Sequence, residues 1–255
     1  MTIIDTHCHL YSEEFATDID AVIERARANG VSKFYLPAID STAIADMLAL
    51  EAKYPGVCIP MMGLHPCYVK ENYKEELNIA EEWLNKREFP AIGEIGLDFY
   101  WDKTFVKEQY NAFSTQMQWA LDKKLPIVIH TRNAMDETIE AVKPFADKGL
   151  RGIFHCFSGD AKAAQQIVDI GFFLGIGGVI TYKNGGLPAA LSSIGVEHLV
   201  LETDAPYLSP VPYRGKRNES SYVQYIVHKL AEVKNTSPTQ VAAITTANAQ
   251  KIFGG

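Results

Sequence analysis

Histidine and carboxylate side chains recur at the ends of short apolar segments of this sequence. His7 and His9 follow the first segment, and Glu94 lies in the fourth, within Ala-Ile-Gly-Glu-Ile-Gly-Leu-Asp. His130 and His155 end the fifth and sixth segments. Alternate residues of an extended chain point to the same side, so the first two imidazoles can reach one point. A carboxylate within an apolar stretch is costly to bury unless it is paired or binds a cation, which makes these residues candidate metal ligands.

Two acidic residues, Glu202 and Asp204, end the eighth apolar segment on one face of the chain. In a closed barrel this segment adjoins the first, so we expect Asp204 to lie beside His7 and His9. Four imidazoles and two carboxylates are too many for one four-coordinate ion with an open position. They suit two ions that share Glu94 as a bridge. Nitrogen and oxygen ligands without thiolates favour Mg²⁺, Mn²⁺, Co²⁺ or Zn²⁺.

A pair of divalent ions at this position predicts hydrolytic chemistry. Two ions a few Å apart generate a bound hydroxide near neutral pH and stabilise the attacking and leaving oxygens of a displacement. We expect Asp204 to bind metal and to act as general base, with Glu94 as the bridge. Phosphoesters are the favoured substrates, because two cations neutralise the charge that develops on phosphate oxygens.

Candidate contacts for an anionic substrate follow the same segments. His65 lies in Gly-Leu-His-Pro, Arg132 follows the fifth segment, and Arg214 and Arg217 lie in a basic loop after the eighth. Arginine can hold a phosphate with two donors. For Arg214 and Arg217 the alternative is a solvated loop that binds no ligand. For the aromatic residues named next, the alternative is packing within the loops. The aromatic side chains that could stack on bases are Tyr207, Phe99, Tyr100, Trp101 and Tyr213.

The elements that would position these residues alternate along the chain. The apolar segments are short enough for buried parallel strands, and they span 3–6, 33–38, 57–63, 91–95, 126–130, 152–155, 172–175 and 198–202. Helical patterns separate them, most clearly from Val106 to Leu121. Eight such units predict a single α/β domain over 1–255, a (β/α)₈ TIM barrel, whose active site lies where the strands end. A doubly wound open sheet is the alternative, although no G-x-G-x-x-G follows the first segment.

Composition limits the classes of protein to which this chain can belong. With 24 Lys+Arg against 31 Asp+Glu, its net charge of −7 excludes a uniformly basic surface that coats nucleic acid. A local basic site remains compatible with this charge. The four cysteines form no C-x-x-C pair, and a chain of this length needs no disulfide. We expect a cytoplasmic protein that does not enter a membrane, because neither a secretory signal nor an apolar run of ~18 residues is visible.

Several motifs together resemble those of the TatD family of metal-dependent deoxyribonucleases. In the family's order over residues 4–219, they are Ile-Asp-Thr-His-Cys-His-Leu, Gly-Leu-His-Pro, Ile-Gly-Glu-Ile-Gly-Leu-Asp-Phe, Ile-His-Thr-Arg, His-Cys-Phe-Ser-Gly, Leu-Glu-Thr-Asp-Ala-Pro-Tyr-Leu and Pro-Tyr-Arg-Gly-Lys-Arg-Asn-Glu. The resemblance implies an amidohydrolase-type TIM barrel that cleaves DNA phosphodiesters, often as a 3′→5′ exonuclease on single strands. It implies two divalent ions held by His7, His9, Glu94, His130, His155 and Asp204.

The same resemblance implies roles for residues around the ligands. It places His65, Arg132 and Glu202 close to the site, with Glu202 as a candidate ligand of a third ion. Glu219-Ser220-Ser221 departs from the Glu-Pro that is usual in the family. A looser start of the following helix would alter the substrate loop and leave the metal ligands in place.

Two further functions stay open at this point. One is an esterase, lactonase or deaminase of the amidohydrolase type that acts on a small substrate. Many such sites use a lysine as a carbamate bridge on the fourth strand, where this chain has Glu94. The other is a metal-binding module without catalysis. Single-stranded DNA is the expected partner, and a monomer is the working assumption for assembly.

Overall fold

Each predicted apolar segment overlaps a strand. The structure, a computed structural model, describes residues 1–183 and 185–254. Across these residues it has eight strands: β1 (Ile3–Asp5), β2 (Val31–Pro37), β3 (Cys58–Met61), β4 (Ile92–Asp98), β5 (Ile127–Arg132), β6 (Gly152–Phe154), β7 (Phe173–Ile176) and β8 (Leu199–Leu201). β4 and β5 extend beyond their predicted ends because Asp98 and Arg132 pair in register. Arg132 therefore belongs to a strand end.

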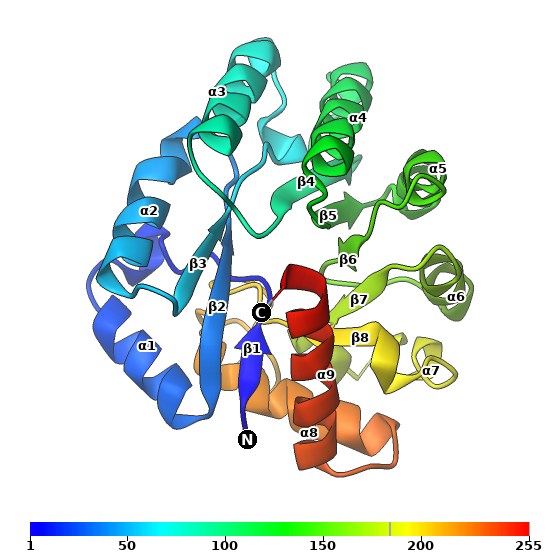
Figure 1. Cartoon of the computed structure of the whole chain (residues 1–255). Coiled ribbons are helices and arrows are strands. Elements are labelled where there is room, and N and C mark those ends of the chain that lie inside the picture. Colours follow the sequence, from blue (N-terminus) through cyan, green and yellow to red (C-terminus); the bar gives the residue numbers. More distant parts are fainter. Residues whose placement is uncertain (184, 255) are drawn as a thin grey trace.

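Helices follow the strands and form an outer ring around them (Figure 1). The α-helices are α1 (Ile19–Ala28), α2 (Ile44–Lys53), α3 (Tyr73–Lys86), α4 (Val106–Lys123), α5 (Met135–Ala146), α6 (Ala161–Asp169), α7 (Leu187–Ala190), α8 (Val223–Val233) and α9 (Pro238–Phe253). Short 3₁₀ helices are η1 (Glu13–Phe15), η2 (Ser41–Ala43), η3 (Pro66–Tyr68), η4 (Gly178–Thr181), η5 (Val196–His198) and η6 (Ser220–Tyr222). At α9 the Ser237 side chain accepts a hydrogen bond from the Gln240 backbone N–H at 3.1 Å, which caps the helix.

Backbone hydrogen bonds close the strands into a barrel. The strands pair in parallel in the orders β1-β2-β3 and β4-β5-β6-β7-β8. Gly93 N donates to Met62 O at 3.0 Å, which joins the two groups, and Thr6 N donates to Leu201 O at 3.0 Å, which joins β1 to β8. The predicted TIM barrel is confirmed. The open doubly wound sheet is excluded, because the first and last strands meet.

A separate apolar cluster fills the barrel interior at the end opposite the candidate site. Its members come from most strands and from α9: Ile4, Tyr35, Met61, Ala91, Val128, Ile153, Val200, Ala249, Ile252 and Phe253. The rings of Tyr35 and Phe253 stack with centroids 3.9 Å apart. α9 lies across this end of the barrel in Figure 1. Such packing closes the end of the barrel at which the strands begin. A substrate would therefore approach from the rim at the carboxyl ends of the strands.

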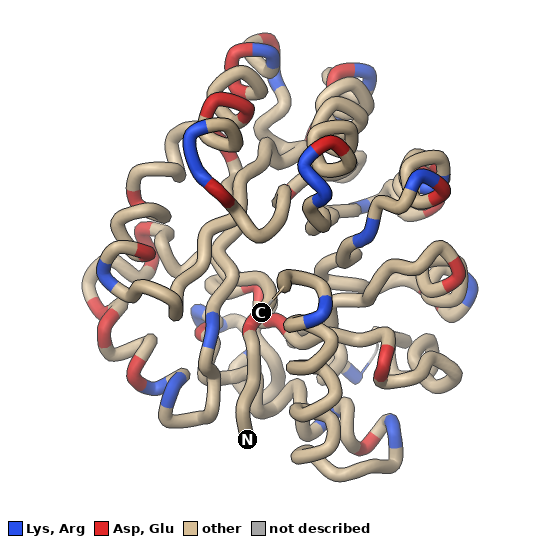
Figure 2. Tube along the Cα trace, viewed as in Figure 1, with Lys and Arg blue, Asp and Glu red and all other residues tan. Residues whose placement is uncertain are grey.

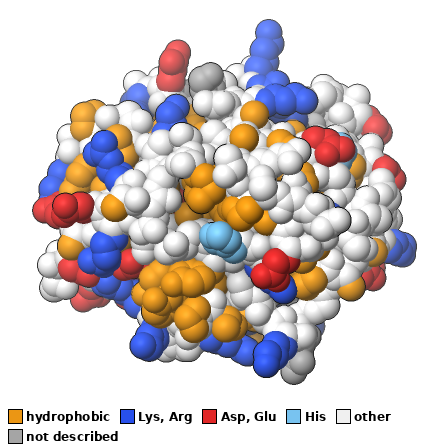
Figure 3. Space-filling model, turned by 90° about the horizontal axis from the view of Figure 1, so that it is seen from below, with side chains coloured by type: hydrophobic (Ala, Val, Ile, Leu, Met, Phe, Trp, Pro, Cys, Tyr) orange, Lys and Arg blue, Asp and Glu red, His pale blue; other side chains and the backbone are white. Residues whose placement is uncertain are grey.

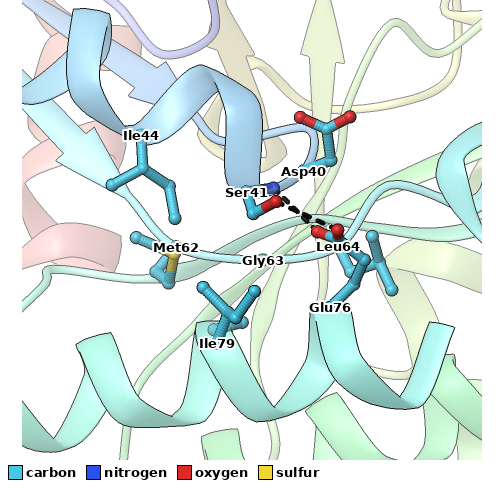
Figure 4. Close-up of a pocket in the computed structure, with 9 residues that line it drawn as sticks. Asp40, Ser41, Ile44, Met62, Gly63, Leu64, Glu76 and Ile79 are labelled. Carbon is cyan, nitrogen blue, oxygen red and sulfur yellow. Dashed lines mark hydrogen bonds between the residues drawn. The ribbon is translucent and has the colours of Figure 1, made fainter. Parts of the chain in front are cut away.

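One hydrogen-bonded pair fixes the loop after β2. Glu76 of α3 accepts hydrogen bonds from the backbone N–H and the hydroxyl of Ser41, at 2.8 and 3.0 Å (Figure 4). Ile44, Met62 and Ile79 lie together to one side of this pair in the same view. The loop is relevant to the rim, because the His65 N–H donates to Ile39 O at 2.9 Å. The contact between α3 and η2 thus helps to place His65.

Lys, Arg, Asp and Glu residues lie mainly on the helices and loops around the barrel (Figure 2). On the face formed by the lower edge of Figure 1, basic and acidic side chains are interspersed around hydrophobic areas (Figure 3). Opposite charges at such spacing partly cancel each other's fields. No α-helix in the part of the chain that the structure describes is both long and apolar enough to cross a membrane.

Candidate metal centre

The barrel brings the six predicted ligands together, although they are spread over two hundred residues of sequence. His7 and His9 follow β1, Glu94 lies in β4 and His130 in β5. His155 directly follows β6, and Asp204 follows β8. Because parallel strands end at one rim, all of these side chains point to the same end of the barrel. Five of the six are buried to more than nine-tenths: His7, His9, Glu94, His155 and Asp204.

The first group of ligand atoms surrounds one oxygen of Glu94. Its Oε2 lies 3.1 Å from His7 Nε2 and 3.5 Å from His9 Nε2. The two Nε2 atoms are 3.3 Å apart. Asp204 Oδ1 lies 3.7 and 3.6 Å from the same two nitrogens. Two atoms bound at about 2.1 Å to one tetrahedral ion lie about 3.4 Å apart, so this spacing fits a shared cation.

The second group surrounds the other oxygen of the same carboxylate. Glu94 Oε1 lies 2.9 Å from His130 Nδ1 and 2.8 Å from His155 Nε2. His65 Nε2 also approaches this oxygen, at 3.2 Å. Glu94 therefore lies between the two groups of histidines, where a bridge between two ions would have to lie. His65 was predicted to contact the substrate. At this distance from Glu94 it lies among the candidate ligands of the second group.

A thiol borders the second group. Cys67 lies with His65 and His130 in a cluster whose ligand atoms are all within 4.8 Å of one another. Burial raises the pKa of Cys67 to about 12, so its thiol stays protonated near neutral pH. In the metal-free protein Cys67 is therefore a neutral thiol at the edge of the second group.

The protonation states suit cation binding by the first group. Burial lowers the pKa of His7 to about 4 and that of His9 to about 3, so both rings are neutral and offer lone pairs. Burial opposes ionisation of Glu94, but His155 and the other histidines hold its pKa well below the usual range. Burial raises the pKa of Asp204 to about 8. A bound cation would favour ionised Asp204, because an adjacent positive charge lowers a carboxyl pKa.

Tyr11 fixes the orientation of His9. Its hydroxyl donates to Pro37 O at 2.6 Å and lies 2.9 Å from His9 Nδ1. A tyrosine hydroxyl has one hydrogen, and a carbonyl can only accept it. The second contact must therefore be a hydrogen bond from His9 Nδ1–H to the tyrosine oxygen. This tautomer leaves the Nε2 lone pair of His9 directed at Glu94 and the candidate cation site.

Asp98 fixes the orientation of His130 in the same way. Its Oδ2 lies 2.8 Å from His130 Nε2, so Nδ1 of that ring is left to face Glu94. Burial opposes ionisation of Asp98, but hydrogen bonds from His130 and the backbone N–H groups of Tyr100 and Trp101 lower its pKa strongly. A carboxylate behind a histidine is the usual way in which metal ligands are oriented.

Glu202 lies behind the second group. Its Oε1 accepts a hydrogen bond from Cys156 N and is 3.5 Å from His155 Nδ1. It is fully buried, and Gly175 allows this position: a Cβ there would lie 2.2 Å from Glu202 Oε2. The same oxygen has no hydrogen-bond partner among the residues described. Glu202 thus contacts the candidate ligand His155 and does not itself belong to the set of cavity-lining residues.

An open cavity of about 880 Å³ leads to both groups. This volume is large enough for a small organic ligand or a nucleotide. Four of the predicted substrate contacts line it, namely His65, Trp101, Arg132 and Tyr207. The set of lining residues does not include Arg214 or Arg217.

Both of these arginines have protein partners. Arg217 pairs with Asp18 through two hydrogen bonds, at 2.8 and 2.7 Å, and the Arg214 guanidinium lies 4.5 Å from the ring centroid of Tyr182. Glu219, the residue before the departure from the family pattern, accepts two hydrogen bonds from Arg25 of α1, at 3.0 and 2.6 Å. The contacts of Arg217 with Asp18 and of Glu219 with Arg25 tie the loop after β8 to the start of the chain.

Asp98 and Tyr11 are the residues of this centre that the sequence analysis missed. Both carry a signal in the sequence. Tyr11 follows His9 at a spacing of two, and Asp98 follows Glu94 at a spacing of four. An even spacing places side chains on one face of an extended chain, so each could have been assigned to the rim.

Comparison with known proteins finds similar proteins over nearly the whole chain. A family model described as TatD related DNase matches residues 4–254. The uncharacterized metal-dependent hydrolase YabD of Bacillus subtilis is 36% identical over 98% of both chains. The 3'-5' ssDNA/RNA exonuclease TatD of Salmonella typhimurium is 34% identical, also over 98% of both. The solved structure of YJJV, a TatD homolog from Escherichia coli K12, superposes with a TM-score of 0.93 at 28% identity, over 99% of this chain and 98% of that one.

Proposed function

The chain belongs to the family of TatD related DNases and is a metal-dependent hydrolase; on this premise we propose that it removes nucleotides from the 3′ end of single-stranded DNA. The observation that carries this proposal is the position of Glu94, whose two carboxylate oxygens face two separate groups of histidines. The printed name of the Salmonella relative, an exonuclease on single-stranded DNA and RNA, supports the substrate class.

Each group of ligand atoms would hold one divalent ion, Mg²⁺, Mn²⁺ or Zn²⁺. We assign His7, His9 and Asp204 to the first ion, His130 and His155 to the second, and Glu94 to both. His155 also lies close to His7 and Asp204, so the two ions would be near neighbours. Two such ions act as Lewis acids on a phosphate ester and lower the pKa of a water molecule. The donor set of imidazole nitrogens and carboxylate oxygens is one that these ions accept.

Residues of the chain itself accept the proton of the attacking water and bind the phosphate of the substrate. Asp204 lies at the cavity wall, where its carboxylate accepts the proton of the attacking water as general base. His65 and Arg132 line the same cavity and hold the non-bridging phosphate oxygens as donors. Tyr207 lines this cavity as well. Arg214 and Arg217 contribute at most a longer-range attraction for the anion, since both already contact other side chains.

Glu202 acts on His155 in this proposal. Its contacts with Cys156 N and with His155 Nδ1 favour the role of a positioning residue over that of a ligand of a third ion. We also propose that the chain works as one domain and as a monomer. All ligands of both groups come from one barrel, so no second copy is needed to complete the centre.

The test is cleavage of single-stranded oligonucleotides that carry a label at the 5′ or the 3′ end. We expect shortening from the 3′ end, loss of activity with EDTA and recovery with Mg²⁺ or Mn²⁺. Asp204→Asn is expected to lose activity while it keeps the fold. If no divalent ion supports cleavage of DNA and the protein instead turns over lactones or amides, the amidohydrolase-type alternative holds.

A further inference from the structure

We propose that Trp101, braced by Tyr100 and Arg132, is a stacking platform for one unpaired nucleobase at the mouth of the metal cavity. This inference rests on the proposed function, because it names the part of a nucleic-acid substrate that is held beside the metal centre. It also supplies a physical reason for a preference for single strands.

Large apolar side chains gather at this mouth. Tyr68, Trp101, Tyr207 and Leu208 are all exposed and all line the cavity. Trp101 is 68% exposed, the largest fraction among the exposed large hydrophobic residues of the described chain. Exposed apolar groups that cluster around a cavity mark a binding site far more often than scattered ones do.

The loop that carries Trp101 is held in place from both sides. Asp98 Oδ1 accepts hydrogen bonds from the backbone N–H groups of Tyr100 and Trp101, at 2.9 and 3.1 Å. Farther along the loop, Asp102 pairs with Lys70 at 2.8 Å. The indole is therefore exposed on a fixed backbone, which lowers the entropy that a ligand must overcome to bind it.

Arg132 joins this platform to a positive charge. Its guanidinium lies 3.8 Å from the ring centroid of Tyr100 and 5.2 Å from that of Trp101. The two rings meet edge to face at 4.9 Å. In the residues that the structure covers, no carboxylate forms an ion pair with Arg132. An aromatic face next to an unpaired cation is the combination with which proteins hold single-stranded nucleic acid, one for the base and one for the phosphate.

The platform and the metal centre share one carboxylate. While Asp98 Oδ1 holds the aromatic loop, Oδ2 of the same residue holds His130 Nε2 at 2.8 Å. The position of the base is thereby fixed relative to the phosphate that is cleaved. A base in a duplex already stacks on its neighbours, so it must leave the helix before it can stack on Trp101. The platform thus favours unpaired ends.

The experiment compares Trp101→Ala, Trp101→Phe and Tyr110→Ala with the unmodified, metal-loaded chain. Tyr110 is the matched control, because it is an exposed aromatic residue of α4 that does not line the cavity. The substrates are a single-stranded oligonucleotide, its blunt duplex and a single strand with abasic residues at the 3′ end. We expect Trp101→Ala to raise KM for the single strand roughly ten- to a hundredfold, and to leave KM for the abasic strand within about twofold. Trp101→Phe restores most of the loss, and Tyr110→Ala has no effect.

A binding measurement separates the platform from catalysis. In Asp204→Asn loaded with Mg²⁺, an oligonucleotide of thymidines should quench tryptophan fluorescence, and the abasic strand should not. The quenching should vanish when Trp101→Phe is added. Equal losses on both strands, or quenching that persists without Trp101, would overturn the platform. A third outcome separates the two proposals. If the quenching depends on Trp101 but the unmodified chain cleaves no DNA with any divalent ion, the proposed function is refuted and the stacking platform stands.

Discussion

The hydrogen bond between Tyr11 and His9 gives a direct prediction about metal affinity. Tyr11→Phe keeps the ring and removes one hydroxyl, which bonds to His9 Nδ1 at 2.9 Å and to Pro37 O at 2.6 Å. His9 loses the partner that fixes its tautomer, so Nε2 no longer presents its lone pair to Glu94 in every molecule. Loss of such an outer partner costs about 10–100-fold in metal affinity.

The stability of the metal-free protein changes as well. Removal of the hydroxyl leaves Pro37 O and His9 Nδ1–H without a partner, which costs about 1–3 kcal/mol in the free energy of unfolding. Tyr182→Phe is the matched control, because the Tyr182 hydroxyl also donates to a backbone carbonyl, that of Ser209, at 2.9 Å. This control is expected to lose similar stability and to keep its metal affinity.

The assay is competition between the protein and a chelator of known affinity, with urea unfolding of the metal-free protein alongside. We expect weaker metal binding in Tyr11→Phe alone and lower stability in both variants. If Tyr11→Phe binds the metal as tightly as the unmodified chain, the hydroxyl does not set the tautomer of His9, and the reasoning from donors and acceptors is refuted.

Three further predictions concern other contacts of the centre and its surroundings. Asp98→Asn should weaken binding of the second ion about 10–100-fold in a metal titration, with the first ion unaffected; equal loss of both ions would contradict separate sites. Gly175→Ala should lower stability by about 1–3 kcal/mol, because its Cβ would meet Glu202 Oε2 at 2.2 Å; an unchanged thermal midpoint would show that the carboxylate moves freely. The Arg25 hydrogen bonds lower the pKa of Glu219 despite its burial, so this pair stabilises the fold above the usual carboxyl pKa and the contribution is lost as the pH falls through the folded pKa. Glu219→Gln should therefore lower the urea midpoint at pH 7 and have little effect near pH 3, and a loss of equal size at both pH values would refute this ion pair.

The barrel and the positions of the candidate ligands could be predicted because both depend on local patterns. A buried parallel strand is a short apolar run, and a ligand such as His130 or His155 is the first polar residue at its end. The order of the strands around the barrel then decides which ligands meet. This is why Glu94, on the fourth strand, could be placed between two histidine groups without coordinates.

The partners of surface charges could not be predicted in this way. Arg217 is one of three cations in its loop, and the sequence gives no sign that Asp18, far away along the chain, accepts its hydrogen bonds. Tyr11 and Asp98 were not predicted as residues of the site for a related reason. They orient a neighbouring candidate ligand, and only the distances between specific atoms reveal this. A spacing identifies a shared face, and it does not identify a hydrogen bond.

The central claim is that Glu94 joins two ions, and anomalous diffraction from crystals grown with Mn²⁺ or Zn²⁺ tests it most directly. We expect two peaks about 3.5–4 Å apart, one next to each carboxylate oxygen, with His7 and His9 at one and His130 and His155 at the other. A single peak, or peaks that lie away from Glu94, would contradict the account.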